Sequence, residues 1–327
     1  MADVAREAGV SGQTVSRVAN GHTNVDEETK ARVLAAMALL DYRPNRAARA
    51  LRSGKFHSIG VIMFTLSTVG NMRTLEGIAI AAAHAAYSIT LIPVAHKTPE
   101  EISVAFSKLR EQAVDGVIIV IEAHLINDAG FEVPNGMPVV IIDSTASDRF
   151  PIIDTDQGQG ARLATEHLLS LGHSTVWHIS GPPESYSAER RTTAWESTLR
   201  DHGAPVPPAL IGDWTTESGY ERGLELAANP DVTAVFVAND QMALGVLRAM
   251  HESGRSVPGD VSVVGFDDME EASSFWPPLT TVRQFFGTVG KRSVEALLEQ
   301  VDGSGPSADV MVGTELVVRE STAAPRG

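Results

Sequence analysis

The sequence predicts an α/β protein in which a small helical headpiece is followed by two lobes, each built on a doubly wound parallel sheet. Two observations predict this fold class. Between residues 59 and 268, short apolar runs alternate with stretches of helical periodicity, which is the pattern of successive βα units. The first 55 residues carry only short helical patterns. A chain of 327 residues is long enough for two or three such units.

Composition excludes several classes of protein. Cys is absent, which rules out disulfides and thiolate sites, and we expect neither a metal nor a cofactor. No apolar run reaches the ~18 residues of a membrane span, and the start lacks the apolar core of a signal peptide, so we expect a cytoplasmic protein without a membrane partner. The net charge is −15, but residues 1–55 hold nine Lys or Arg against six Asp or Glu. A basic region on an acidic body favours local contact with phosphates.

Three short helices are predicted in the headpiece. The first covers residues 2–8. The second begins after Ser11, a good N-cap, with Val10 and Val15 placed to form a hydrophobic staple. The third begins after Asp26 and has acidic residues in its first turn, which suits the helix dipole. Two helices joined by a short turn containing glycine form a helix-turn-helix, whose second helix enters the DNA major groove.

The second helix has one thin apolar edge and one broad polar face. At about 100° per residue, Val15, Val18 and Ala19 share a stripe. The side chains that point away from it are Gln13, Ser16, Arg17 and Asn20. Hydrogen-bonding groups on an exposed helix face are what reading base edges requires. The alternative is a small solvated three-helix bundle that binds no nucleic acid.

Residues 42–55 contain five cations and no acid. Arg46 and Arg49 lie one turn apart beside small alanines and Leu51, which predicts a helix of about eight residues. So short a helix is unstable alone in water, so we expect it to fold on a partner. Its arginines can neutralise phosphates, and Leu51 has the character of an apolar wedge for the minor groove of double-stranded DNA. The alternative is a basic linker between domains.

Seven apolar runs predict parallel strands that are covered on both faces. They span residues 59–64, 88–94, 116–121, 138–143, 175–180, 233–240 and 260–268.

Ligands bind beyond the carboxyl ends of such strands. Those ends carry Asp143, Gly181 with Pro182, Asn239 with Asp240, and Asp267 with Asp268. Their carboxylates and amides suit paired sugar hydroxyls, although Asn239, Asp240 and Asp268, each taken singly, fit a helix cap better. Arg191 could donate to a ligand or be a solvated helix residue, and Trp214 and Phe286 could stack on a pyranose or pack in the core.

Motifs along essentially the whole chain resemble the LacI family of transcriptional regulators. They include "DVAREAGVSGQTVSRVANG", "YRPNRAARALRSGK", "GPPESYSAERR", "VANDQMALGVLRAM" and "PGDVSVVGFDD". The resemblance implies a DNA-binding headpiece over residues 1–44, a hinge helix and linker over 45–56, and an effector-binding and dimerisation core over 57–327. It implies a periplasmic-binding-protein-like core (type I) whose N-lobe takes about 57–154 and 286–311, and whose C-lobe takes about 155–285 and 312–321.

The resemblance also implies which residues contact DNA. Gly12, Gln13 and Arg17 occupy base-reading positions, and Leu51 of the hinge helix inserts at the centre of a palindromic operator. The full predicted set is Ser11, Gly12, Gln13, Thr14, Ser16, Arg17, Asn20, Tyr42, Asn45, Arg46, Ala48 and Leu51. Gly12 has no side chain where the family's prototype carries a tyrosine, so we expect a different operator half-site. Only two residues precede Asp3, so we expect a shortened N-terminal arm.

For the effector, the resemblance implies a pocket for a small sugar, with a β-galactoside as the leading candidate. Arg191, Asn239 and Asp267 bind hydroxyls, Asp143 and Gln284 lie nearby, and Trp214 and Phe286 stack. Phe64 and Val120 stand where the prototype has polar residues, so we expect half of the pocket to be more apolar. The chain ends at Gly327 without leucine heptads, so we expect a homodimer.

The functional expectation is a repressor that the sugar releases from its operator, with a co-repressor that tightens DNA binding as the alternative. An enzyme is a weaker interpretation. Gly158 and Gly160 begin a dinucleotide-type pattern, but Leu163 stands where its third glycine belongs. His173 and His178 flank an apolar run and are expected to be structural. A sugar-binding transport protein would leave the first 55 residues without a purpose.

Overall fold

The computed structural model describes residues 1–19, 24–42, 54–95, 98–120, 133–143, 150–305 and 308–326. It divides into two compact units, Met1–Phe56 and His57–Gly327. The first is helical and the second is α/β, which confirms the predicted fold class. Within the described ranges, no helix has the length and apolar character needed to span a membrane.

The first unit holds α1 (Ala2–Ala8), α2 (Gly12–Ala19) and α3 (Glu27–Leu39); α1 has the predicted bounds, and α2 and α3 begin directly after the predicted caps. The capping predictions are confirmed. Ser11 Oγ accepts the Thr14 backbone N–H at 3.2 Å, and Asp26 Oδ1 accepts that of Thr29 at 2.8 Å. Val10 packs against the buried cluster that includes Val15, as the hydrophobic staple requires. These local contacts fix where α2 and α3 begin.

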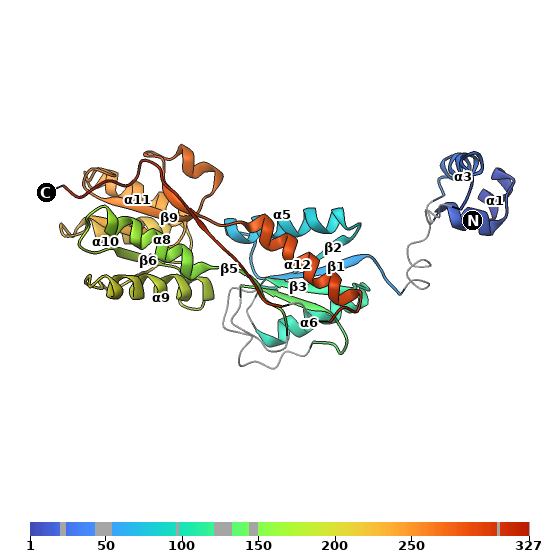
Figure 1. Cartoon of the computed structure of the whole chain (residues 1–327), viewed down its shortest axis with the longest axis horizontal. Helices are drawn as coiled ribbons and strands as arrows, with labels where there is room; N and C mark the ends of the chain where they lie inside the picture. Colours follow the sequence, from blue (N-terminus) through green and yellow to red (C-terminus); the bar gives the residue numbers. More distant parts are fainter. Residues whose placement is uncertain are drawn as a thin grey trace. The chain divides into compact units, whose positions relative to one another are not determined.

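In the second unit, the first lobe has a four-stranded parallel sheet in the order β2-β1-β3-β4. Its elements are β1 (Ser58–Met63), α5 (Val69–His84), β2 (Ser88–Pro93), α6 (Pro99–Glu111), β3 (Gly116–Val120), β4 (Val139–Ile142) and α12 (Phe286–Val301). Phe106 of α6 packs on one face of the sheet, and Ile78 of α5 and Val294 of α12 pack on the other. The lobe therefore includes a helix from late in the chain (Figure 1).

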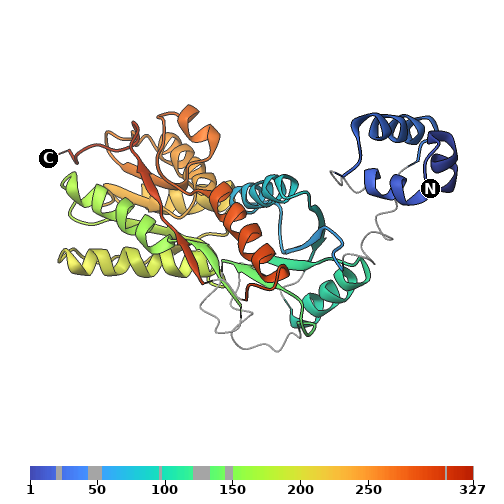
Figure 2. The same ribbon diagram turned by 45° about the vertical axis from the view of Figure 1, so that its right-hand side comes forward.

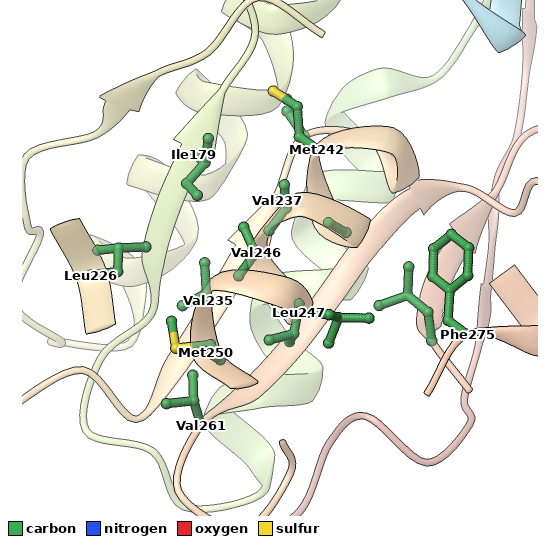
Figure 3. Packing of buried hydrophobic residues seen from close by; sticks show 14 of the residues in the cluster. Ile179, Leu226, Val235, Val237, Met242, Val246, Leu247, Met250, Val261 and Phe275 are labelled. Atoms are coloured by element: carbon green, nitrogen blue, oxygen red, sulfur yellow. The ribbon is translucent and has the colours of Figure 1, made fainter. Parts of the chain in front are cut away.

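The second lobe has a six-stranded sheet in the order β12-β10-β9-β8-β6-β7, in which β12 alone is antiparallel to its neighbour. Its strands are β6 (Trp177–Ser180), β7 (Leu210–Ile211), β8 (Ala234–Val237), β9 (Ser262–Asp267), β10 (Thr280–Arg283) and β12 (Glu315–Val317). Its helices are α8 (Gln157–Ser170), α9 (Tyr186–Asp201), α10 (Thr216–Ala227), α11 (Asp240–Glu252) and the 3₁₀ turn η1 (Glu270–Ser274). Helices α10 and α11 cover one face, where Met242 and Met250 of α11 belong to one buried cluster with Val235 and Val237 of β8 (Figure 3). Helices α8 and α9 cover the other, around Trp195.

Two short parallel strands, β5 (Ile153–Thr155) and β11 (Val310–Val312), pair with each other. They lie side by side between the two sheets (Figures 1 and 2). Each of the seven predicted apolar runs contains a strand, but β5, β7, β10, β11 and β12 were not anticipated. These strands are short, and β10 has the sequence TTVR, so no long apolar run in the sequence predicts them. Polar Thr280 and Thr281 are fully buried there because neighbouring side chains satisfy their hydroxyls.

His178 of β6 is a buried structural histidine. Its Nδ1 lies 2.9 Å from the Phe236 carbonyl oxygen and donates to it, and its Nε2 accepts from the Thr192 hydroxyl at 3.2 Å. Burial lowers the pKa of His178 to about 4, because the charged imidazolium would lose its hydration.

We expect this histidine to make stability fall as pH decreases from about 6.5 towards 4. In that window the unfolded chain binds a proton at His178 and the folded chain does not, at a cost of about 3 kcal/mol at the acid end. Urea unfolding measured across this range should therefore show a shallower pH slope for His178→Gln than for the wild type. Equal slopes would mean that His178 is not the group responsible.

Candidate functional site

A pocket lies at the carboxyl ends of strands from both sheets; its empty space, adjoining open solvent included, is about 590 Å³. Seven of the predicted effector residues line it: Asp143, Arg191, Trp214, Asn239, Asp267, Gln284 and Phe286. Phe64 does not line the pocket. It follows the end of β1 and packs with Phe106 and Ile62 on the α6 face of the first sheet. Val120, the other residue expected to make the first-lobe side apolar, does line the pocket.

Arg191 is held rigidly at the pocket wall. Only 4% of its surface is exposed, which excludes the solvated helix arginine considered from the sequence. Its Nε donates to Gln157 Oε1 at 2.9 Å, and its Nη1 donates to the Ala238 carbonyl. The guanidinium carbon lies 3.8 Å from the centroid of the Phe266 ring and 5.5 Å from that of Trp214. A guanidinium fixed in this way is preorganised to donate to a ligand oxygen.

Asp267 ends β9 within a chain of side-chain hydrogen bonds. Gln284 Nε2 donates to Asp267 Oδ1 at 2.6 Å, and Gln157 Nε2 donates to Gln284 Oε1 at 3.2 Å. Arg191 Nη2 is 4.0 Å from Asp267 Oδ1. Asp143, Trp214 and Asp267 all have positive φ, at 58°, 74° and 113°. Three pocket residues are therefore held in backbone conformations that side chains rarely adopt, a feature typical of functional sites.

Asn239 lines the pocket and also caps α11. Its Oδ1 accepts the Met242 N–H at 2.8 Å and caps α11, and its Nδ2 donates to the Trp214 carbonyl at 3.1 Å. The cap therefore also places the loop that presents the Trp214 ring. Gly181, at the end of β6, leaves the space for that ring, because a Cβ atom there would overlap it.

The carboxylates next to the pocket residues have structural partners. Asp240 accepts from Thr281 Oγ1 at 2.6 Å and from the Met269 N–H at 2.8 Å. Burial, and then the nearby charge of Asp267, raise the pKa of Asp240 well above its usual range. Asp268 pairs with Arg283 at 2.7 Å and with Arg319 at 2.6 Å. Neither residue lines the pocket.

Sequence reasoning missed several lining residues, among them Asn71, Asp154, Thr155, Gln157 and Ser187. Asp154 and Thr155 belong to β5, which is too short to show an apolar run. Gln157 opens α8 directly after that strand. A search for polar residues at the start of each helix that follows a strand would have found Gln157 and Ser187.

The glycines of the dinucleotide-type pattern and the histidine His173 both have packing or hydrogen-bonding roles in the second lobe. Gly158 and Gly160 lie in α8, where Gly160 makes room for the Phe266 ring; a Cβ atom there would come within 2.6 Å of it. His173 contacts Thr233, Ser262 and the Ala323 carbonyl at 3.0–3.1 Å. The described residues contain no group of His, Cys, Asp and Glu arranged to hold a metal ion.

The polar face of α2 is open to solvent. Gly12, Gln13 and Arg17 are exposed, whereas Val15 and Val18 are buried. Of the other predicted DNA contacts, Ser11 is exposed, Thr14 and Ser16 are half-buried, and Tyr42 is half-buried against the headpiece core. Asn20, Asn45, Arg46, Ala48 and Leu51 lie outside the described residues.

A helix-turn-helix headpiece in one chain with a two-lobed, periplasmic-binding-protein-like core defines a class of transcriptional regulators. Residues 1–45 match the model of bacterial regulatory proteins of the lacI family, and residues 165–322 match that of periplasmic-binding-protein-like domains. The chain belongs to the LacI family of DNA-binding transcriptional regulators.

Relatives and solved structures agree with this assignment. The chain is 37% identical to the lactose operon repressor of Escherichia coli, over 99% of this chain and 90% of that protein. It is 31% identical to the repressor PurR of Histophilus somni, over 98% and 97%. The structure of the lac repressor dimer bound to operator and the anti-inducer ONPF superposes with a TM-score of 0.86 at 35% identity, covering 98% of both chains. A complex of the regulator CelR with cellobiose gives a TM-score of 0.73 at 28% identity, again over 98% of both.

Proposed function

We propose that this chain is a repressor that binds a palindromic operator as a homodimer and leaves it when a small sugar occupies the pocket. The observation that carries the proposal is the pocket itself. Asp267 and Arg191 are fixed acceptor and donor groups suited to neighbouring hydroxyls, and Trp214 and Phe286 offer faces for the apolar side of a sugar ring. A β-galactoside is the first candidate, in keeping with the similarity to the lactose operon repressor.

The polar face of α2 supports the DNA-reading half of the proposal. In the major groove, Arg17 can donate two hydrogen bonds to a guanine, and Gln13 can pair with an adenine. Gly12 contributes no side chain, so the base opposite it is read less strictly.

Arg17→Ala should weaken operator binding by about 1–3 kcal/mol and relax the preference at one base position of each half-site. Arg32→Ala is the matched control, because Arg32 is a cation of α3 whose guanidinium donates to Thr29 rather than extending from the polar face of α2. Both variants are titrated by fluorescence anisotropy against operators substituted at each position. An unchanged base preference in Arg17→Ala would contradict the assignment of α2 as the reading helix.

The homodimer is proposed from exposed apolar side chains on both lobes. Met72 and Ile80 of α5 are about half exposed, and Trp276 after η1 is 93% exposed. We assign these three exposed apolar side chains to the contact surface. Two headpieces brought together in this way would match a two-fold symmetric operator. Analytical ultracentrifugation of the wild type and of Trp276→Ser tests the association.

The whole proposal is tested by selecting binding sites from a random palindromic DNA pool, with and without a panel of galactosides and glucosides. A symmetric site that one sugar releases supports it. A sugar that tightens binding would replace the inducer with a co-repressor. Symmetric binding that no sugar alters would overturn the sugar half of the proposal, and turnover of the bound sugar would point to an enzyme.

A further inference from the structure

Asp154 is a buried carboxyl group at the wall of the pocket. It lies at the middle of β5, between the two sheets, and only 2% of its surface is exposed. Its Oδ2 accepts from Arg190 Nη1 of α9 at 2.6 Å, and its Oδ1 accepts the Thr155 N–H at 2.7 Å. Asp154 is therefore held by the strand on one side and by the second lobe on the other.

These two hydrogen bonds leave the carboxylate with acceptor capacity. An ionised carboxyl group offers about four lone-pair positions, and the two bonds occupy two of them. Because Asp154 lines the pocket, a group bound there can use the others. A hydroxyl group of a ligand fits, since it can donate one hydrogen bond to a carboxylate oxygen.

The charges around the pocket favour such a donor over an anion. Three lining residues are carboxylates, Asp143, Asp154 and Asp267, while Arg191 is the cation among the described lining residues. Arg191 already donates to Gln157 and to the Ala238 carbonyl, and Arg190 is paired with Asp154. A phosphate or carboxylate on the ligand would be repelled at short range by these carboxylates.

We propose that Asp154 is a specificity-determining residue of the pocket: it accepts a hydrogen bond from a hydroxyl group of an uncharged sugar and disfavours the phosphorylated or carboxylated counterpart. The inference rests on the proposed function, because it requires that the pocket bind a sugar. It assigns a polar role to the side of the pocket that the sequence predicted to be apolar.

The protonation of Asp154 gives the proposal a second readout. Burial raises the pKa of Asp154 to about 6, and the opposing charges of Arg190 and Arg191 only partly offset it. A donor that binds the ionised form therefore binds less well as pH falls below about 6, by up to about tenfold per pH unit. Asp143 and Asp267 are the other carboxylates facing the pocket, so the Asp154 contribution must be isolated by substitution.

The experiment uses the full chain and isothermal titration calorimetry between pH 5 and 8. The probes are methyl β-D-galactoside, lactose and cellobiose, together with galactose 6-phosphate and galacturonic acid. Asp154→Asn keeps the shape and removes the charge. Asp260→Asn is the matched control, because it removes one carboxylate from an exposed ion pair with Arg326 that is not part of the pocket. Arg190→Gln removes the cation that pairs with Asp154, and circular dichroism checks that each variant is folded.

The wild type should bind an uncharged sugar at least tenfold more tightly than the anionic ones. In Asp154→Asn the preference for the uncharged sugar should be at least about tenfold smaller, and most of the fall in sugar affinity below pH 6 should disappear. Asp260→Asn should bind all of the probes as the wild type does. In Arg190→Gln the midpoint of the fall in sugar affinity should move to higher pH, because the cation that favours the ionised form of Asp154 is gone. If sugar binds and releases DNA but Asp154→Asn and Arg190→Gln behave like the wild type, the inference on Asp154 is overturned and the proposed function stands. If the wild type binds none of the probes, the sugar function falls and the inference falls with it.

Discussion

Asp267→Asn should lower the affinity of the pocket for its sugar by roughly 10- to 100-fold while operator binding is retained. The reason is that hydrogen bonds to a charged carboxylate contribute about 1.5–3 kcal/mol, and 1.4 kcal/mol corresponds to a factor of ten. Asn is the appropriate replacement because it keeps the shape and tolerates the positive φ of 113° better than most residues do. Titration calorimetry measures the affinity for sugar. Fluorescence anisotropy with operator DNA measures whether sugar still releases the protein from the operator.

Asp268→Asn is the matched control for this experiment. It makes the same change one residue later, at a carboxylate that pairs with Arg283 and Arg319 and does not line the pocket. It should lower the thermal stability and leave the affinity for sugar within about twofold. An Asp267→Asn protein that still responds to sugar at wild-type concentrations would show that the ligand binds elsewhere.

Gly245→Ala should destabilise the second lobe by about 3 kcal/mol, the upper end of the usual cost of overpacking. Helices α10 and α11 approach each other at Gly245, where an added Cβ atom would overlap the Thr216 carbonyl oxygen and lie 2.5 Å from the Tyr220 nitrogen. Both obstacles are backbone atoms, so no side chain can rotate away to make room. The free energy of unfolding is measured by urea titration.

Gly287→Ala separates this close approach from the general effect of glycine in a helix. Gly287 lies within α12, and a Cβ atom added there meets nothing within 4 Å. Alanine should therefore stabilise the protein slightly, by up to about 1 kcal/mol, because it has the higher helix propensity. If both variants lost the same stability, the packing explanation for Gly245 would be wrong.

Local sequence determined the headpiece. The N-caps Ser11 and Asp26 and the apolar spacing of Val15 and Val18 act over a few residues, so they can be read without tertiary information. The same holds for the seven strands that coincide with apolar runs, because those runs are long enough to stand out, although β2 at the edge of its sheet is partly exposed rather than covered on both faces. Asp143, Asn239 and Asp267 could be found because each follows such a run, and parallel strands bring their carboxyl ends to one edge.

What the tertiary structure decided depends on contacts between residues far apart in the chain. Phe64 packs on α6 rather than lining the pocket, since the position of its side chain depends on the helix that covers the sheet there. The polar strand β10 is buried because Asp240 and Ser321 satisfy its threonine and backbone groups, 41 residues away in each direction. Asp154 reads as an ordinary surface acid until β5 and α9 come together. Sequence patterns report local periodicity, whereas the partner that makes a buried charge tolerable is set only by folding.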